Sequence, residues 1–138
     1  MSKWTTLARK LLPILWITLV YLTVTLAEGK DPSPPSWTMA WLLFESRHVA
    51  AHTLAFSAEV WLVARAVGMR PDAARRDVAI ALGLGVALGI GLEVLQAALR
   101  PTYVILDGLW DVLVDGIGAA VGWQIYRAGW RPDPRARP

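Results

Sequence analysis

The sequence predicts an all-α fold: a polytopic membrane protein built as a bundle of four transmembrane helices, with both termini in the cytoplasm. Apolar residues make up 55% of the chain and charged residues only 18%, a balance typical of polytopic membrane proteins and too apolar for a small soluble domain. The apolar residues also fall in four long runs, and the basic residues cluster between and outside these runs. The 138 residues are enough for one membrane domain, residues 1–138, and not for two.

Each apolar run has about the length of a spanning helix, roughly 17–25 residues. Helices are required because the lipid interior offers the backbone no hydrogen-bond partner. The expected spans are residues 11–27, 48–67, 78–99 and 107–126. A cleavable signal peptide is an alternative for the first run, which follows a basic arm and ends in Thr25-Leu26-Ala27. The length of the run favours a span.

The polar segments between the runs define the loops. We expect an outer loop at residues 28–47, a cytoplasmic loop at 68–77 and a basic tail at 127–138. The stretch 28–36 is rich in proline and cannot continue a helix. Arg100-Pro101 ends the third helix, and Asp107 is placed to cap the N-terminus of the fourth.

The distribution of lysine and arginine predicts the orientation. All but three of the 14 basic residues lie in the N-terminal arm, in or beside the middle loop, or in the C-terminal tail. Four spans place these regions on one side of the membrane, and the positive-inside rule makes that side the cytoplasm. Lys30, Arg47 and Arg100 belong to the outward loops.

Ionisable and amide side chains within the expected spans, or at their ends, mark the candidate site. A charged group at the centre of a spanning helix costs roughly 2.5–3.5 kcal/mol, so such residues usually face the protein interior or a wet cavity. The main candidates are His52, Glu93, Gln96, Arg100, Asp111 and Asp115. Secondary candidates are Glu59, His48 and Asp107.

The candidate residues of each helix share one face. They recur three or four positions apart, as in His48 and His52 or in Asp111 and Asp115, which is the spacing of a helical stripe. Carboxylates facing lipid would be costly, so we expect three polar faces to meet in one pocket that opens to the outside. Glu59 should lie deepest, near the middle of the membrane.

Two pairs of glycines recur at four-residue spacing. These are Gly85 with Gly89 and Gly118 with Gly122. Small residues at this spacing let membrane helices approach closely, either within one chain or between two copies in a homo-oligomer. Glycine is also simply frequent in membrane helices, which is the alternative explanation for each pair.

The polar motifs resemble the VanZ-like family of small bacterial membrane proteins. The resemblance covers about residues 47–126 and rests on His52 within HVAAHTLAF, Glu93 to Gln96 within LEVLQ, Arg100, and the segment DVLVDGIGAAVG. It implies a multi-pass protein of the bacterial cytoplasmic (inner) membrane with a role in the cell envelope, linked to resistance to the glycopeptide teicoplanin. It implies no defined reaction. Val49 and Ala55 depart from the family, which often has a basic and an acidic residue there.

No cofactor is predicted, and a divalent metal is an alternative. Imidazole and carboxylate groups on facing helices suit zinc or manganese, and the ligands would be His48, His52, Glu93 and Asp111. Hydrogen bonds that only join helices are the other explanation for these residues. The chain has no cysteine, so disulfides and thiolate metal sites are excluded.

The expected partners are membrane lipids and a lipid-linked or glycopeptide ligand, and no nucleic acid, because no basic face on a soluble fold is present. Four functions stay open. The first, favoured by the resemblance, is an envelope protein whose pocket binds a lipid-linked, peptidoglycan-related or glycopeptide molecule. The second is an intramembrane hydrolase or transferase with Glu93 or Asp111 as general base, acting with or without a metal. The third is a proton- or cation-coupled transporter, and the fourth is a structural helper for other membrane proteins.

Overall fold

Four helices make up nearly all of the described chain. The structure is a computed structural model that describes residues 3–27, 38–70, 75–99 and 105–130. The helices are α1 (Lys3–Ala27), α2 (Met39–Val67), α3 (Arg75–Leu99) and α4 (Ile105–Gly129). No strand occurs within these ranges. The all-α, four-helix prediction is therefore confirmed.

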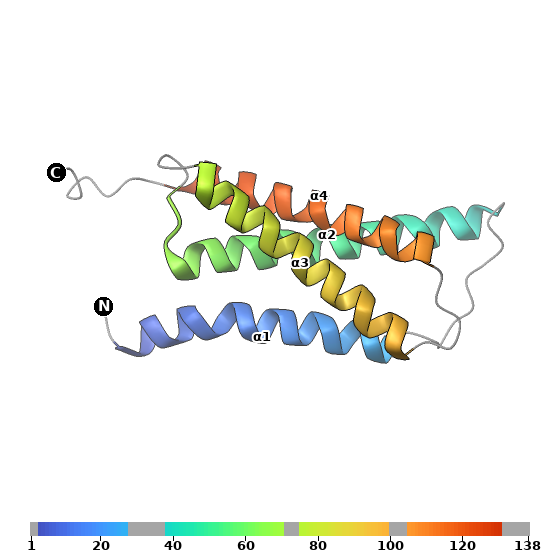
Figure 1. The fold of residues 1–138 in the computed structure, drawn as a ribbon, viewed down its shortest axis with the longest axis horizontal. Coiled ribbons are helices and arrows are strands. Elements are labelled where there is room, and N and C mark those ends of the chain that lie inside the picture. The colour runs from blue at the N-terminus through green and yellow to red at the C-terminus, as the bar shows by residue number, and fades with distance from the viewer. Residues whose placement is uncertain (1–2, 28–37, 71–74, 100–104, 131–138) are drawn as a thin grey trace.

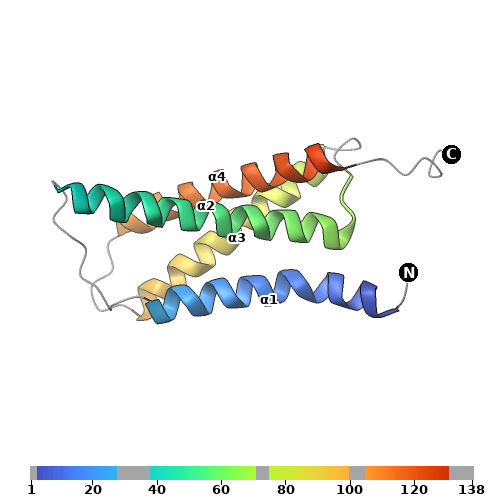
Figure 2. The same cartoon turned by 180° about the vertical axis from the view of Figure 1, so that it is seen from behind.

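Helices α2 and α4 form the closest pair in the bundle. Figures 1 and 2 show them side by side, with α1 running along the other side of α2. Helix α3 starts beside the C-terminal end of α4, crosses the bundle, and ends near the C-terminal end of α1 (Figures 1 and 2). The contact between α2 and α4 is therefore the most extensive one in the bundle.

Helix α2 begins well before the span expected from the sequence. Thr38 caps it, because the Thr38 hydroxyl accepts a hydrogen bond from the backbone N–H of Trp41. The prolines end before this cap, so nothing in residues 39–47 stops a helix. The expectation of an outer loop through residue 47 is therefore wrong for residues 39–47. The helix ends at Gly68, which adopts the left-handed conformation (φ 71°) that favours glycine.

Helix α4 also begins earlier than expected, at Ile105. Asp107 consequently lies inside the first turn of the helix and does not cap it. Its negative charge still complements the positive end of the helix dipole. The prediction of an Asp107 cap is therefore wrong, because the helix extends two residues further toward its N-terminus.

The glycine pairs are points of close helix contact. A Cβ built on Gly122 would overlap the backbone carbonyl of Ser57, and one on Gly118 would lie 2.8 Å from the carbonyl oxygen of Thr53. On α3, a Cβ on Gly85 would lie 2.5 Å from the Cβ of Ala119. The absence of side chains therefore lets α4 pack directly on the α2 backbone and on α3, within one chain.

Large apolar side chains are exposed while several polar ones are buried. Leu15, Leu54, Val94 and Leu113 are 63%, 70%, 65% and 55% exposed, one on each helix. The buried polar and charged residues are His52, Ser57, Glu59, Glu93, Gln96, Asp111 and Asp115. In water-soluble proteins, acidic side chains are almost never fully buried unless they are paired. The bundle thus has an apolar outside and a partly polar inside.

One described helix is long and apolar enough on its own to cross a membrane, and that helix is α3. In α1 the apolar stretch, Lys10–Thr23, is shorter. Helices α2 and α4 carry histidine and acidic residues along their inward faces, and these residues lower the hydropathy of each helix taken alone. Composition therefore gives weak support for association with a membrane, and the burial pattern adds to it.

The close contact at Gly122 can be tested by adding a single methyl group. Gly122→Ala should lower the free energy of unfolding by about 1–3 kcal/mol, because the new Cβ overlaps the Ser57 backbone and forces α2 and α4 apart. Gly116→Ala is the matched control on the same helix, since its Cβ would lie 3.7 Å from Val86, an ordinary contact. The control should be neutral, or stabilising by about 0.5–1 kcal/mol through helix propensity. Denaturant unfolding in detergent followed by circular dichroism measures both, and equal effects would contradict the packing described above.

Candidate functional site

Two histidine–aspartate pairs connect α2 to α4. His48 Nε2 donates to Asp111 Oδ1 at 2.8 Å, and His52 Nδ1 donates to Asp115 Oδ1 at 2.7 Å. An ionised carboxylate only accepts hydrogen bonds, so the ring nitrogen is the donor in each pair. Both pairs join residues that are 63 positions apart in the chain. One helical turn along α2 is therefore matched by one turn along α4.

The two pairs differ in burial. The side chains of His52 and Asp115 are 7% and 0% exposed, whereas those of His48 and Asp111 are 34% and 12% exposed. The His48 pair is one turn closer to the N-terminal ends of α2 and α4 than the His52 pair. The His52 pair is the more deeply buried of the two. Burial makes each hydrogen bond of the deeper pair more important, because an unpaired group there has no water to replace its partner.

Helix α3 closes the site from a third direction. A Cβ on Gly89 would lie 2.7 Å from Oδ2 of Asp115, so the missing side chain makes room for the carboxylate. This Oδ2 atom is buried and has no hydrogen-bond partner among the described residues. The sequence predicted that Gly89 served helix packing, and the structure shows that it packs specifically around Asp115.

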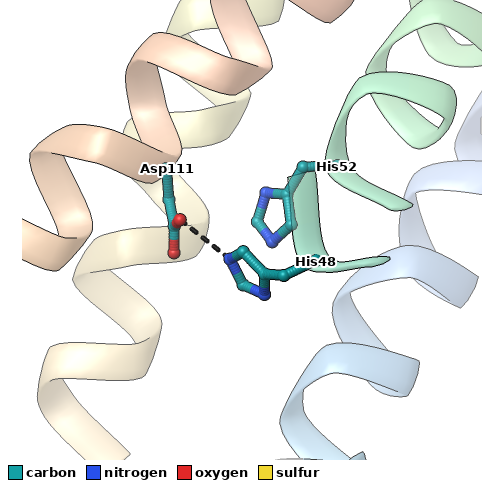
Figure 3. A group of neighbouring side chains, drawn as sticks. All are labelled: His48, His52 and Asp111. Carbon is teal, nitrogen blue, oxygen red and sulfur yellow. Dashed lines mark hydrogen bonds and ion pairs between the residues drawn. The ribbon is translucent and has the colours of Figure 1, made fainter. Parts of the chain in front are cut away.

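Three of these residues form a group that can hold a metal ion. Donor atoms of His48, His52 and Asp111 all lie within 4.8 Å of one another. Figure 3 shows the two imidazole rings next to each other on α2, with their planes tilted by 37°, and the Asp111 carboxylate pointing toward His48 from α4. The ring centroids are 4.4 Å apart. Of the four ligands that the sequence suggested, Glu93 alone is outside this group.

The other candidates on α2 and α3 are inside the bundle. Glu59, Glu93 and Gln96 are 3%, 6% and 2% exposed. Glu93 follows Gly89 by one helical turn, so it lies on the α3 face that meets α4 at Asp115. Helix α3 diverges from α4 toward this end (Figures 1 and 2). Glu93 is not among the residues whose donor atoms form the possible metal-binding group.

Asp107 and Glu59 are not part of the group. Asp107 is exposed on α4, one turn before Asp111. Arg100 lies outside the described residues. Glu59 is buried as expected, and its Oε2 atom has no hydrogen-bond partner within the described part of the chain. The structure thus brings together His48, His52, Asp111 and Asp115, and gives His48 a central place that the sequence did not.

An apolar cavity of about 500 Å³ lies between α1 and α2 and reaches the histidine site. Trp16 and Leu19 of α1, Leu54 of α2 and Leu92 of α3 contribute to its wall. His52 is also part of the wall and is the one ionisable side chain among the described residues that line it. A volume of this size is within the usual range for small-molecule sites, about 300–1,000 Å³.

Hydrogen bonds from aromatic residues of α1 were not anticipated from the sequence. The Trp16 indole donates to the carbonyl of Ala55 at 3.0 Å, and the Tyr21 hydroxyl donates to the carbonyl of Leu88 at 2.5 Å. Both residues stand in a run without charges, where an N–H or O–H group needs a partner inside the protein. The hydrogen-bonding requirement of Trp16 and Tyr21 was therefore the sequence signal that could have predicted which face of α1 packs against the other helices.

The contact between Glu45 and Trp110 was also missed. The Trp110 indole donates to Glu45 Oε1 at 2.9 Å. Trp110 directly precedes Asp111 in the chain, so this contact is next to the His48–Asp111 pair. The expected outer loop covered Glu45, so the residue was not considered as part of a helix. With α2 beginning at Met39, Glu45 precedes His48 by three residues and lies on the same side of the helix.

Comparisons of this chain with protein-family models, with curated proteins and with solved structures found no match. The geometry of the site therefore carries the functional argument.

The deeper pair should contribute more to stability than the shallower one. His52→Ala should lower the free energy of unfolding by about 3–5 kcal/mol, because it leaves Asp115 buried without its partner. His48→Ala should cost less, since water reaches both partners of that pair. Equilibrium unfolding in detergent measures both.

A double-mutant cycle separates the pair from its surroundings. His52→Ala combined with Asp115→Ala should cost clearly less than the sum of the two single changes. Additive costs, or a His48→Ala variant less stable than His52→Ala, would contradict the account of the two pairs.

Proposed function

We propose that this chain crosses a bacterial inner membrane four times and binds an amphipathic molecule of the cell envelope at the outer end of the α2–α4 seam. By this seam we mean the contact between α2 and α4 that contains His48, His52, Asp111 and Asp115. The apolar exterior of the bundle supports insertion, because exposed leucine and valine side chains match a lipid environment. The buried acidic residues support it as well, since polar groups within a membrane protein face its interior. The arginines around residues 65–76 support a cytoplasmic position for the α2–α3 connection under the positive-inside rule.

The observation that carries the ligand proposal is the contact between an apolar cavity and a polar site. His52 belongs to both: it faces the cavity between α1 and α2, and it is hydrogen-bonded to Asp115. An amphipathic molecule fits this arrangement, with its hydrocarbon part in the cavity and its polar part at His48 and Asp111. Ligand sites commonly combine an apolar wall with a few convergent polar groups.

The chemistry of such a ligand agrees with the resemblance to VanZ-like proteins. Lipid-linked cell-wall precursors have a polyprenyl chain and a charged head, and glycopeptides such as teicoplanin act on the same part of the cell. We therefore propose a VanZ-like role in which the bundle binds or handles a lipid-linked envelope molecule. Leu54 lines the cavity and is 70% exposed, which supports entry of a ligand from the surrounding lipid.

A second candidate function is intramembrane hydrolysis or group transfer assisted by a metal. The His48, His52 and Asp111 donor group favours it, since two imidazoles and a carboxylate are a common set for catalytic zinc. A metal at that place would polarise a phosphoryl or carbonyl oxygen of a ligand seated beside it. Binding of the envelope molecule is the step that both functions share.

Filling the cavity tests the binding proposal. Ala51 lines the cavity, and Ala50 beside it does not, although both are exposed on α2. In lipid nanodiscs, a polyprenyl diphosphate should raise the unfolding temperature of the wild-type protein. Ala51→Trp should reduce this shift at least several-fold, because the indole occupies the space for the hydrocarbon chain.

The matched control Ala50→Trp should keep the wild-type shift. A phospholipid with two straight acyl chains serves as the comparison ligand and should have a smaller effect. The binding proposal fails if the polyprenyl diphosphate does not stabilise the wild-type protein, or if Ala51→Trp and Ala50→Trp respond alike.

A further inference from the structure

We propose that His48, His52 and Asp111 bind one divalent transition-metal ion, with zinc as the best fit, and that Asp115 orients His52 for this purpose. The inference stands apart from the binding of an envelope molecule, because metal binding requires only the α2–α4 seam. It assigns a role to all four residues of the two histidine–aspartate pairs.

The donor atoms need little movement to surround an ion. Zinc binds histidine nitrogen and carboxylate oxygen at about 2.0–2.2 Å, so tetrahedral ligand atoms lie roughly 3.3 Å apart. The donors of the three residues already lie within 4.8 Å of one another, and His48 Nε2 is 2.8 Å from Asp111 Oδ1. The latter distance must open slightly. The proton on His48 Nε2 leaves to solvent while Nδ1 stays or becomes protonated, and the hydrogen bond between these atoms is replaced by two bonds to the metal.

Asp115 occupies the place that an outer carboxylate takes in many metal sites. It accepts the hydrogen bond of His52 Nδ1 at 2.7 Å, which leaves the lone pair of His52 Nε2 for a metal. Carboxylate–histidine–metal chains fix the tautomer and the orientation of the ligand and increase its basicity. The tight packing of Gly89 against Asp115 holds this carboxylate in place.

Charge balance also favours a cation. Asp111 and Asp115 are both buried, one turn apart on the same helix, and no lysine or arginine is hydrogen-bonded or ion-paired to either among the described residues. Metal binding requires neutral imidazoles and ionised carboxylates, and in that state the two negative charges of the site would be neutralised by a divalent ion. Burial of unpaired charge is costly, and coordination to a metal is one of the few ways to offset this cost.

Three protein ligands leave one position of a tetrahedral ion open. Catalytic zinc sites have this composition, whereas structural sites use four protein ligands. The site is not sealed from outside, because His48 is 34% exposed, so water or a ligand would reach an ion held there. The site therefore suits an ion that contacts an oxygen of a second molecule, such as a phosphate or a carboxylate.

Metal content measured on the full-length protein tests the inference. The protein is purified in detergent with an affinity tag that contains no histidine, incubated with zinc, passed over a chelating resin and measured by elemental analysis. Wild-type protein should retain about one zinc ion per chain. His48→Ala, His52→Ala and Asp111→Asn should each retain almost none, and Asp115→Asn should bind zinc about 10–100-fold more weakly.

Asp107→Asn is the matched control, because Asp107 is an exposed aspartate one turn before Asp111 on the same helix. It should bind zinc as the wild type does. A wild-type protein without zinc would overturn the inference, and so would ligand variants that retain as much zinc as the control.

A measurement on the wild type alone covers the case in which a variant does not fold. The X-ray absorption spectrum of the zinc-loaded protein should show scattering from two imidazole rings, and a spectrum without imidazole ligands would overturn the inference. Zinc bound by these residues together with a failure to bind polyprenyl diphosphate would reject the proposed ligand and keep the metal site.

Discussion

The paired hydrogen bonds between α2 and α4 are the interaction on which the rest of the structure depends. His48 with Asp111 and His52 with Asp115 repeat with the same sequence separation, so they fix both the register and the facing surfaces of the two helices. Glycines 118 and 122 bring the backbones close enough for these short contacts to form. In a lipid environment the apolar surfaces of helices provide little driving force for association, and close packing with polar contacts has to provide it. The same residues then define the site, because the groups that join the helices are also the groups that can bind a cation.

Much of the fold followed from the sequence by simple physical rules. Runs of apolar residues predicted four helices, and the small residues at four-residue spacing predicted close contacts that the structure confirms at Gly85, Gly118 and Gly122. The spacing of polar residues predicted that His52, Asp111 and Asp115 face inward, and all three are buried. These predictions succeeded because helical periodicity fixes which residues share a face. The crossing of the membrane by all four helices and the resemblance to VanZ-like proteins remain proposals.

The parts that the sequence did not predict depend on pairing between distant residues. Periodicity places His48 and Asp111 on inward faces, but the register between two helices decides whether they meet, and no local rule gives that register. The expected span began at His48, whereas α2 begins at Met39, so His48 lies well inside the helix. Glu93 was expected among the ligands, and the group of donor atoms that the structure brings together does not include it. The apolar cavity beside His52 arises from the position of α1, which two single hydrogen bonds from Trp16 and Tyr21 help to define.

The central claim is that this polar seam lies within a membrane-crossing bundle and is nearer the outer surface. Single-cysteine labelling tests it directly, since the chain has no native cysteine that would react. Cysteine is introduced at the exposed positions Ser46, Arg70, Asp107 and Ala128, and intact cells are treated with a membrane-impermeant maleimide. The account predicts that positions 46 and 107 react in intact cells and that positions 70 and 128 react only after the cells are opened. Reaction of position 70 from outside, or identical reaction of positions 46 and 70, would contradict it.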